Sequence, residues 1–213
     1  MILNGAFGPR FFCRVGWALP TVLRCERHNG GRCPPYQLLA NGEGGMTRHS
    51  IYQGKVVDLG METVLLPNGQ NIELEIVRHP GGAAVLALDD EQRVCVLHQY
   101  RHAIGGWLWE LPAGKLDPGE PPLTTAQREL EEEAGVRAQQ WQSLGTMVST
   151  PGFCDEVIHL FIARELTAVP LRREHDEVMQ VFWWTPDELR THLAQGDVRD
   201  AKTLVALYRW MQK

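Results

Sequence analysis

One stretch of the chain, residues 114–136, constrains the fold and the chemistry more than any other. It reads GKLDPGEPPLTTAQRELEEEAGV. Its first half is rich in turn-forming residues, whereas residues 123–134 contain no glycine or proline and predict a helix. Pro121 and Pro122 suit the start of a helix, the two threonines that follow can cap it, and Gly135 is placed where a C-terminal cap belongs. The stretch therefore predicts a loop, one helix and a second loop.

The acidic residues of this helix are unusual for an ordinary solvent-facing surface. Glu129, Glu132 and Glu133 are spaced so that three carboxylates share one helix face, and Glu131 adds a fourth charge nearby. Like charges repel, and the end of a helix favours cations, so each carboxylate costs from a few tenths to about 1 kcal/mol. A hard divalent cation, Mg²⁺ or Mn²⁺, would offset that cost. A solvated acidic face without a metal is the alternative interpretation.

The spacing of the stretch resembles the signature of the Nudix hydrolases. The signature is a glycine, five residues, a glutamate, seven residues, Arg-Glu, an aliphatic residue, one residue, Glu-Glu, one residue, a glycine and an aliphatic residue. This chain fills the fixed positions with Gly114, Glu120, Arg128, Glu129, Leu130, Glu132, Glu133, Gly135 and Val136.

The resemblance implies an enzyme that hydrolyses nucleoside diphosphates linked to another group, by metal-dependent attack of water on the pyrophosphate. It implies that Glu129, Glu132 and Glu133 hold the metal and that Glu120 pairs with Arg128 to keep the preceding loop in register. It also implies an α/β (α+β) fold, in which a mixed β-sheet is sandwiched between helices and an antiparallel strand region precedes it.

Flanking residues are similar to one branch of that family, the ADP-ribose pyrophosphatases. The segment QYRH leads into WELPAG, which places Arg101 and Glu110 at strand ends beside the expected cleft. The resemblance implies that Arg101 contacts phosphate and that the backbone carbonyl of Ala113 is a metal ligand. Pro151, sixteen residues after Gly135, is a further mark of the branch; a simple Pro-Gly turn is the alternative interpretation.

Hydrolysis also needs a group that orients or deprotonates the attacking water. A carboxylate on a mobile loop can provide it, and the polar loop 167–177 offers Glu174 and Glu177, with Asp176 as a further candidate. His175 is a weaker candidate because exposed loop histidines are rarely catalytic. The sequence leaves the choice between Glu174 and Glu177 open.

The remaining pattern predicts strands around the single acidic helix. Expected strands are 51–59, 61–66, 72–77, 83–88, 94–100, 141–149, 156–163 and 178–184, with hairpin turns at 67–70 and 89–92. Two C-terminal helices are expected, one capped by Thr185-Pro186 and ended by Gly196, and one over 200–212. The helical spacing of Leu204, Leu207, Tyr208 and Met211 predicts that they face the core.

The N-terminal residues 1–45 differ from the rest of the chain. They hold five arginines against two acidic residues, lack periodicity and contain three of the five cysteines. We interpret them as an unpatterned or disordered extension that is not native, with Met46 as the natural start. A targeting leader and a zinc site of Cys25, His28 and Cys33 are weaker alternatives. The expected organisation is this extension, an N-terminal β region at 46–80 and a hydrolase domain at 81–213.

Composition excludes several other classes of function. The chain has 213 residues, is 44% hydrophobic and carries a net charge of −5, so it offers no general basic surface for nucleic acid or an anionic membrane. Its apolar runs are shorter than the roughly 18 to 20 residues needed to cross a bilayer. Unpaired cysteines are consistent with the cytoplasm.

The sequence-based hypothesis is therefore a cytoplasmic Mg²⁺- or Mn²⁺-dependent enzyme that converts ADP-ribose into AMP and ribose 5-phosphate. Two alternatives stay open: a pyrophosphatase of GDP-mannose or other nucleoside diphosphate sugars, and a sensor domain that binds ADP-ribose without hydrolysing it. The resemblance further implies a homodimer in which the strands of residues 51–77 cross to the partner.

Overall fold

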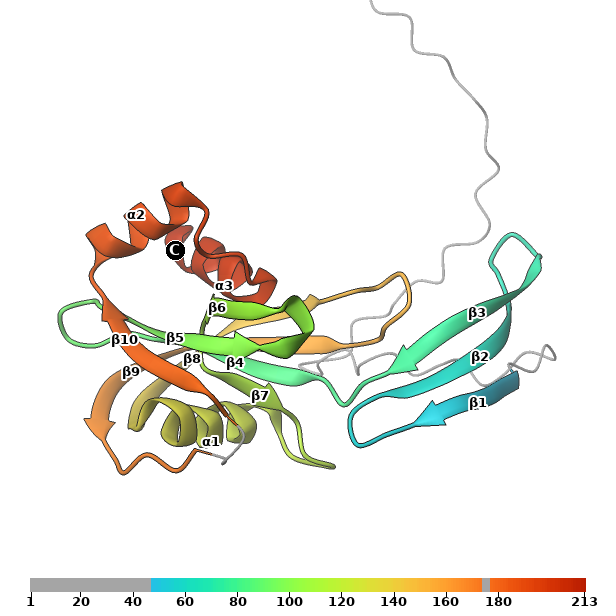
Figure 1. The fold of residues 1–213 in the computed structure, drawn as a ribbon, viewed down its shortest axis with the longest axis horizontal. Helices are drawn as coiled ribbons and strands as arrows, with labels where there is room; N and C mark the ends of the chain where they lie inside the picture. Colours follow the sequence, from blue (N-terminus) through green and yellow to red (C-terminus); the bar gives the residue numbers. More distant parts are fainter. Residues whose placement is uncertain (1–46, 174–176) are drawn as a thin grey trace, which may run out of the picture. The chain divides into compact units, whose positions relative to one another are not determined.

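A computed structural model gives the fold and describes residues 47–173 and 177–213. The expected extension, 1–45, lies outside the described residues. Three α-helices, a short 3-10 helix and three sheets make up the described part (Figure 1). The strands are β1 (Thr47–Gln53), β2 (Asp58–Leu65), β3 (Asn71–Arg78), β4 (Gly82–Ala87), β5 (Val94–Arg101), β6 (Gly106–Glu110), β7 (Ala113–Lys115), β8 (Val136–Val148), β9 (Val157–Ala168) and β10 (Met179–Trp184). The helices are η1 (His102–Ile104), α1 (Pro122–Ala134), α2 (Pro186–Gln195) and α3 (Ala201–Met211).

The central sheet is mixed and has helices on both faces. Its strand order is β7-β4-β9-β8, with β4 parallel to β9 and the other pairs antiparallel. Figure 1 shows α1 on one side of this sheet, and α2 and α3 on the other. The arrangement confirms the expected fold class, a mixed sheet between helices.

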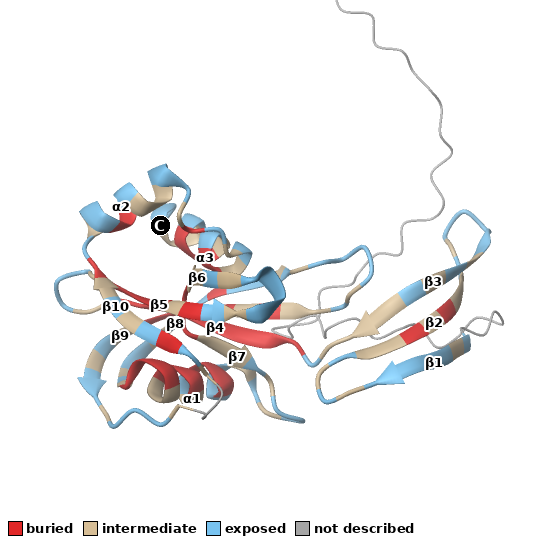
Figure 2. Ribbon diagram, in the orientation of Figure 1, coloured by how far each residue is buried: buried red, intermediate tan, exposed pale blue. Residues whose placement is uncertain are grey.

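Strand β4 is the centre of the core because every one of its residues is buried (Figure 2). Its alternate residues contact different helices: Val85 packs in one cluster with Leu130 of α1, and Leu86 packs in the other with Leu207 of α3. A strand buried on both faces reads as a continuous apolar run. This explains why residues 83–88 show no polar alternation.

Helix α1 begins and ends close to the predicted residues, but its first turn is not capped as expected. Gly135 takes a left-handed conformation (φ 66°) at the C-terminal end, as predicted. The N-cap is Pro121, which makes no side-chain cap. The Thr125 hydroxyl instead donates a hydrogen bond of 2.7 Å to the Glu120 carboxylate. The predicted threonine cap was wrong because this hydroxyl anchors the preceding loop.

The expected hairpin between residues 83–88 and 94–100 was also wrong. A turn is present, since the Gln92 N–H donates to the Asp89 carbonyl, but beyond a single bridge the two strands separate into different sheets. Strand β5 instead lies between β10 and β6. The sequence of two apolar strands joined by a turn does not indicate which strands they pair with. The hydrophobic pattern therefore could not show that β4 and β5 belong to different sheets.

Helix α3 faces the core with a different set of residues from the predicted one. Leu207 is buried as expected, but Leu204, Tyr208 and Met211 are exposed. Thr203 and Ala206 are buried in their place. The hydrophobic pattern favoured the larger residues, because it does not show which face of the helix meets the sheet.

The N-terminal strands form an antiparallel sheet of their own, in the order β1-β2-β3. The predicted break between the first two strands was misplaced: the chain turns at 54–57, where the Gly54 N–H donates to the Val57 carbonyl. The predicted turn at 67–70 is confirmed, with Gly69 at φ 83°. No helix among the described residues is long and apolar enough to cross a membrane.

Candidate active site

A cavity of about 700 Å³ lies where α1, α3 and the ends of several strands meet. This volume is within the range of about 300–1,000 Å³ that is typical of small-molecule sites. Most of the residues singled out from the sequence line it: Arg101, Glu110, Ala113, Gly114, Arg128, Glu129, Glu132, Glu133 and Glu177. The fold thus brings residues from the strand end, the helix and the polar loop to one place.

Glu133 is the most deeply buried acidic side chain of the cavity, with 1% of its surface exposed. Its carboxylate accepts a hydrogen bond of 2.8 Å from the Ala113 backbone N–H. Burial, followed by the neighbouring charge of Glu129, raises the pKa of Glu133 well above its usual value. A buried carboxylate beside another negative charge is unfavourable unless a cation accompanies it.

Glu129 lies one helical turn before Glu133 and packs directly against the backbone of Gly114. A Cβ atom at position 114 would come within 1.8 Å of the Glu129 carboxylate oxygen. Burial raises the pKa of Glu129, and the charges of Glu132 and Glu177 add to that shift, while Arg128 opposes it. The glycine that opens the signature is therefore needed here to make room for a charged side chain.

We expect Gly114→Ala to displace the Glu129 carboxylate. Because the clash involves the far end of a flexible side chain, thermal stability should change little, whereas turnover should fall about 10- to 100-fold, as when groups that orient a metal site are removed. Steady-state kinetics and thermal unfolding of the variant measure both effects. Gly106→Ala is the matched control, since a Cβ there meets nothing within 4 Å. Wild-type turnover in Gly114→Ala would contradict the required position of Glu129.

The Arg128 side chain lies among the carboxylates of the signature. Its Nη1 lies 2.7 Å from the Glu129 carboxylate and 3.2 Å from that of Glu132. The same guanidinium pairs with Glu120 at 3.2 Å, which is the expected ion pair. Hydrogen bonds from Arg128, followed by one from Thr125, lower the pKa of Glu120.

The donor set of this cluster fits a hard divalent cation. Carboxylate and backbone carbonyl oxygens are the ligands that Mg²⁺ and Mn²⁺ prefer, and two of the carboxylates, Glu129 and Glu133, are buried with raised pKa values. Among the described residues, no three acidic, histidine or cysteine side chains are already grouped as a metal site. An ion bound by Glu129 and Glu132 would compete with Arg128 for these carboxylates.

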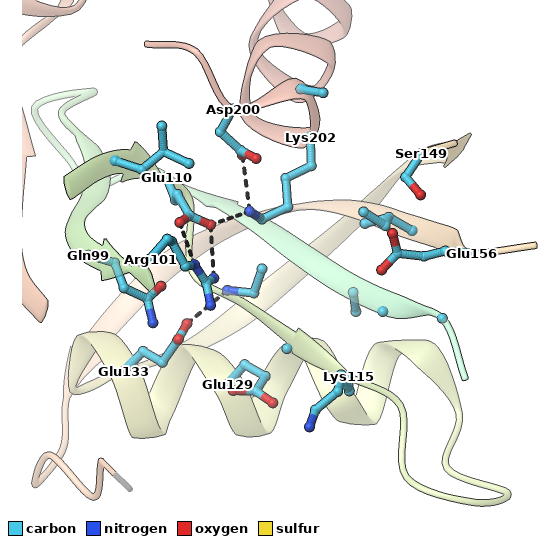
Figure 3. Close-up of a pocket in the computed structure, with 18 of the residues that line it drawn as sticks. Gln99, Arg101, Glu110, Lys115, Glu129, Glu133, Ser149, Glu156, Asp200 and Lys202 are labelled. Atoms are coloured by element: carbon cyan, nitrogen blue, oxygen red, sulfur yellow. Dashed lines mark hydrogen bonds and ion pairs between the residues drawn. The ribbon is translucent and has the colours of Figure 1, made fainter. Parts of the chain in front are cut away.

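Two cations face this acidic cluster across the cavity. Arg101 binds the Glu110 carboxylate with two parallel bonds, Nε to Oε1 at 2.7 Å and Nη2 to Oε2 at 2.9 Å. Lys202 pairs with the same carboxylate and, at 3.1 Å, with Asp200 (Figure 3). Burial opposes ionisation of Glu110, but Arg101 and Lys202 outweigh it, so the pKa of Glu110 is lowered.

Of the candidate bases in the polar loop, only Glu177 is among the described residues, and Pro151 lies outside the cavity lining. Glu177 lines the cavity, close enough for its charge to raise the pKa of Glu129 and Glu133. Glu174, His175 and Asp176 lie outside the described residues. Pro151 lies in an exposed turn and is not among the described residues that line the cavity, so its contact with substrate stays a prediction.

The sequence interpretation missed Lys202, Asp200 and Gln99, which also line the cavity. For Lys202 a signal existed. It is the second residue of α3, where the helix dipole disfavours a cation by a few tenths to about 1 kcal/mol, so an acidic partner nearby would be expected. Its partner Glu110 is 92 residues away in the chain, and local patterns do not reveal such a pairing.

The cavity falls within residues 78–207, which match the family profile described as NUDIX domain. The chain belongs to the Nudix family. This confirms the predicted family, fold and enzyme class, a Nudix hydrolase. Hydrolases of this family generally require divalent metal ions.

Similar proteins agree with this assignment. The chain is 41% identical over 164 residues to a protein of Bacillus subtilis (strain 168) named ADP-ribose pyrophosphatase, covering 76% of this chain and 89% of that protein. It is also 41% identical over 161 residues to the methanol dehydrogenase activator of Bacillus methanolicus, covering 74% and 86%. A crystal structure of an ADP compounds hydrolase superposes with a TM-score of 0.67, at 19% identity, over 81% of this chain and 96% of that one. This last likeness supports the Nudix fold alone.

Proposed function

We propose that this Nudix hydrolase splits the pyrophosphate bond of ADP-ribose, giving AMP and ribose 5-phosphate. One observation carries the proposal: a single cavity holds buried carboxylates on one side and the phosphate-binding type of side chain, Arg101, on the other. The relative from Bacillus subtilis that is named for the same substrate supports the choice of ADP-ribose.

Each group has a distinct part in the proposed reaction. Arg101 binds phosphate oxygens with the part of its guanidinium that does not bind Glu110. Glu129, Glu132, Glu133 and the Ala113 carbonyl would hold a divalent ion, Mg²⁺ or Mn²⁺. When bound, that ion supplies charge neutralisation for the phosphates and lowers the pKa of a coordinated water.

The remaining requirement is the position of the attacking water. A loop carboxylate accepts its proton and directs it to one phosphorus, and Glu177 is the described candidate because it lines the cavity. Water adds to that phosphorus, and the bridging oxygen leaves with the other phosphate. The two monophosphates are the products. Glu174 stays a candidate for the same part.

A product assay tests the proposal. Purified protein with Mg²⁺ is incubated with ADP-ribose, GDP-mannose, NADH, diadenosine polyphosphates and 8-oxo-dGTP, and the products are separated by chromatography. We expect ADP-ribose to give the highest kcat/KM, with AMP and ribose 5-phosphate in equal amounts. A Glu133→Gln preparation in parallel excludes a contaminating hydrolase. Preference for GDP-mannose would move the substrate to another nucleoside diphosphate sugar, and binding without turnover would indicate a sensor.

The proposal includes a homodimer formed through the N-terminal β region, residues 46–80. The small sheet β1-β2-β3 supports it because Ile51, Tyr52 and Leu65 expose large apolar side chains. Light scattering of the purified chain measures its mass.

A further inference from the structure

Lys202 lies at a position that is electrostatically unfavourable for a lysine. It lies in the first turn of α3, where the helix dipole disfavours a cation, and only 12% of its side chain is exposed. Two acidic partners compensate for that cost: the ammonium pairs with the Glu110 carboxylate and lies 3.1 Å from that of Asp200. The lysine is therefore held by charge pairing at the wall of the cavity.

Lys202 and Arg101 bind the same carboxylate, that of Glu110. Glu110 is almost fully buried, with 2% of its surface exposed, whereas 41% of the Arg101 side chain is exposed. One oxygen of Glu110, Oε2, accepts bonds from both Arg101 and Lys202. Figure 3 shows Glu110 between the two cations, with Arg101 pointing towards the side of the cavity that holds Glu133.

The first turn of α3 is tied to the same strand end by a second bond. The Leu111 backbone N–H donates to the buried Thr203 hydroxyl at 2.9 Å. That hydroxyl in turn donates to Asp200 at 2.6 Å, the residue that caps α3 and pairs with Lys202. Glu110 and Leu111 are therefore both attached to the first turn of α3, and the bond from Lys202 helps to orient the Glu110 carboxylate.

We propose that Lys202 is a positioning residue for substrate binding: it fixes Glu110, which holds Arg101 so that the Nη1 edge, which Glu110 does not bind, faces the pyrophosphate. The inference rests on the proposed function and adds to it a residue outside the family signature. Arg101 uses Nε and Nη2 for Glu110, so a rotation of that carboxylate turns the guanidinium as a unit.

Charge balance gives Lys202 a second consequence for the same step. Arg101 and Lys202 carry two positive charges, and Glu110 and Asp200 carry two negative charges, so this side of the cavity is balanced. Removing the ammonium leaves Arg101 to neutralise Glu110 alone, which draws the guanidinium towards Glu110 and away from the substrate diphosphate. Both consequences weaken binding of the ground state and the transition state alike, so the effect falls on KM more than on kcat.

A double-mutant cycle tests the inference with ADP-ribose and Mg²⁺. We expect Lys202→Met to raise KM about tenfold and Lys202→Arg, which keeps the charge, to raise it much less. In an Arg101→Gln background, Lys202→Met should raise KM by less than about twofold, because Lys202 acts through Arg101. Fully additive effects, or an unchanged KM in Lys202→Met, would overturn the positioning role. If Lys202→Met does not fold, Lys202→Gln takes its place in the cycle.

Arg209→Met is the matched control for a purely structural effect. Arg209 lies on the same helix and anchors it by bonds to the Leu144 and Thr146 carbonyls at 2.8 and 3.0 Å, and none of these three residues lines the cavity. Its loss should lower Tm and leave KM unchanged. An equal rise of KM in Arg209→Met would show that Lys202 acts only by holding α3 in place. Absence of turnover of every substrate by the wild type would instead defeat the proposed function.

Discussion

Replacing Glu133 by glutamine is expected to lower kcat about a thousandfold, or about 4 kcal/mol of transition-state stabilisation. The amide keeps the size of the side chain and can still accept the bond from the Ala113 N–H, but it loses the charge that would hold a metal ion. Thermal stability should not fall. Because burial raises the pKa of Glu133, its ionised form destabilises the folded state at neutral pH, and glutamine removes that cost.

The expected result is therefore an inactive protein with an unchanged or higher Tm in the presence of a chelator. Steady-state kinetics and thermal unfolding measure the two quantities on the same preparation. Glu131→Gln is the matched control, since Glu131 lies on the same helix but pairs with Arg137 and Arg172. Hydrogen bonding from Arg137 lowers the pKa of Glu131. Loss of the Glu131 charge should therefore lower Tm slightly and leave kcat unchanged. Turnover of Glu133→Gln at the wild-type rate would refute the metal-binding role.

The opposite roles of Glu131 and Glu133 show how far the sequence alone could reach. The spacing correctly indicated which three acids share a helix face, because helix geometry is local. It did not reveal that the fourth acid has two arginine partners, one of them 41 residues away in the chain. Local rules likewise predicted the caps of α1 and α2 at Gly135 and Thr185.

Predictions failed where the answer depended on packing between distant segments. Residues 83–88 and 94–100 were assigned to one hairpin, yet their strands have different neighbours in two sheets. The core face of α3 was assigned to its large residues, whereas Thr203 and Ala206 are the residues buried beside Leu207. Lys202 was not predicted as a site residue, because only the folded chain brings it to Glu110.

Removal of divalent ions is expected to abolish turnover and to lower Tm at pH 8. With Mg²⁺ at about 100 times its dissociation constant, binding stabilises the folded state by about 2.7 kcal/mol. For a domain of this size that corresponds to a Tm rise of about 5–10 °C over the value in a chelator. The rise should be much smaller in Glu133→Gln, which lacks one of the proposed ligands.

The difference in Tm between Mg²⁺ and a chelator should depend on pH, because the pKa values of Glu129 and Glu133 are raised. A carboxyl group whose pKa is higher in the folded state binds protons more tightly there, so its contribution to stability falls as pH rises from the unfolded pKa through the folded one. In a chelator, the Tm of the wild type relative to Glu133→Gln should therefore decrease from pH 5 to pH 8. Mg²⁺ binds the ionised carboxylates and should reverse that trend, so its stabilising effect should be small at pH 5 and large at pH 8. Differential scanning fluorimetry across this pH range, with and without Mg²⁺, measures the effect; equal Tm values in Mg²⁺ and chelator at pH 8 would exclude an ion among these carboxylates.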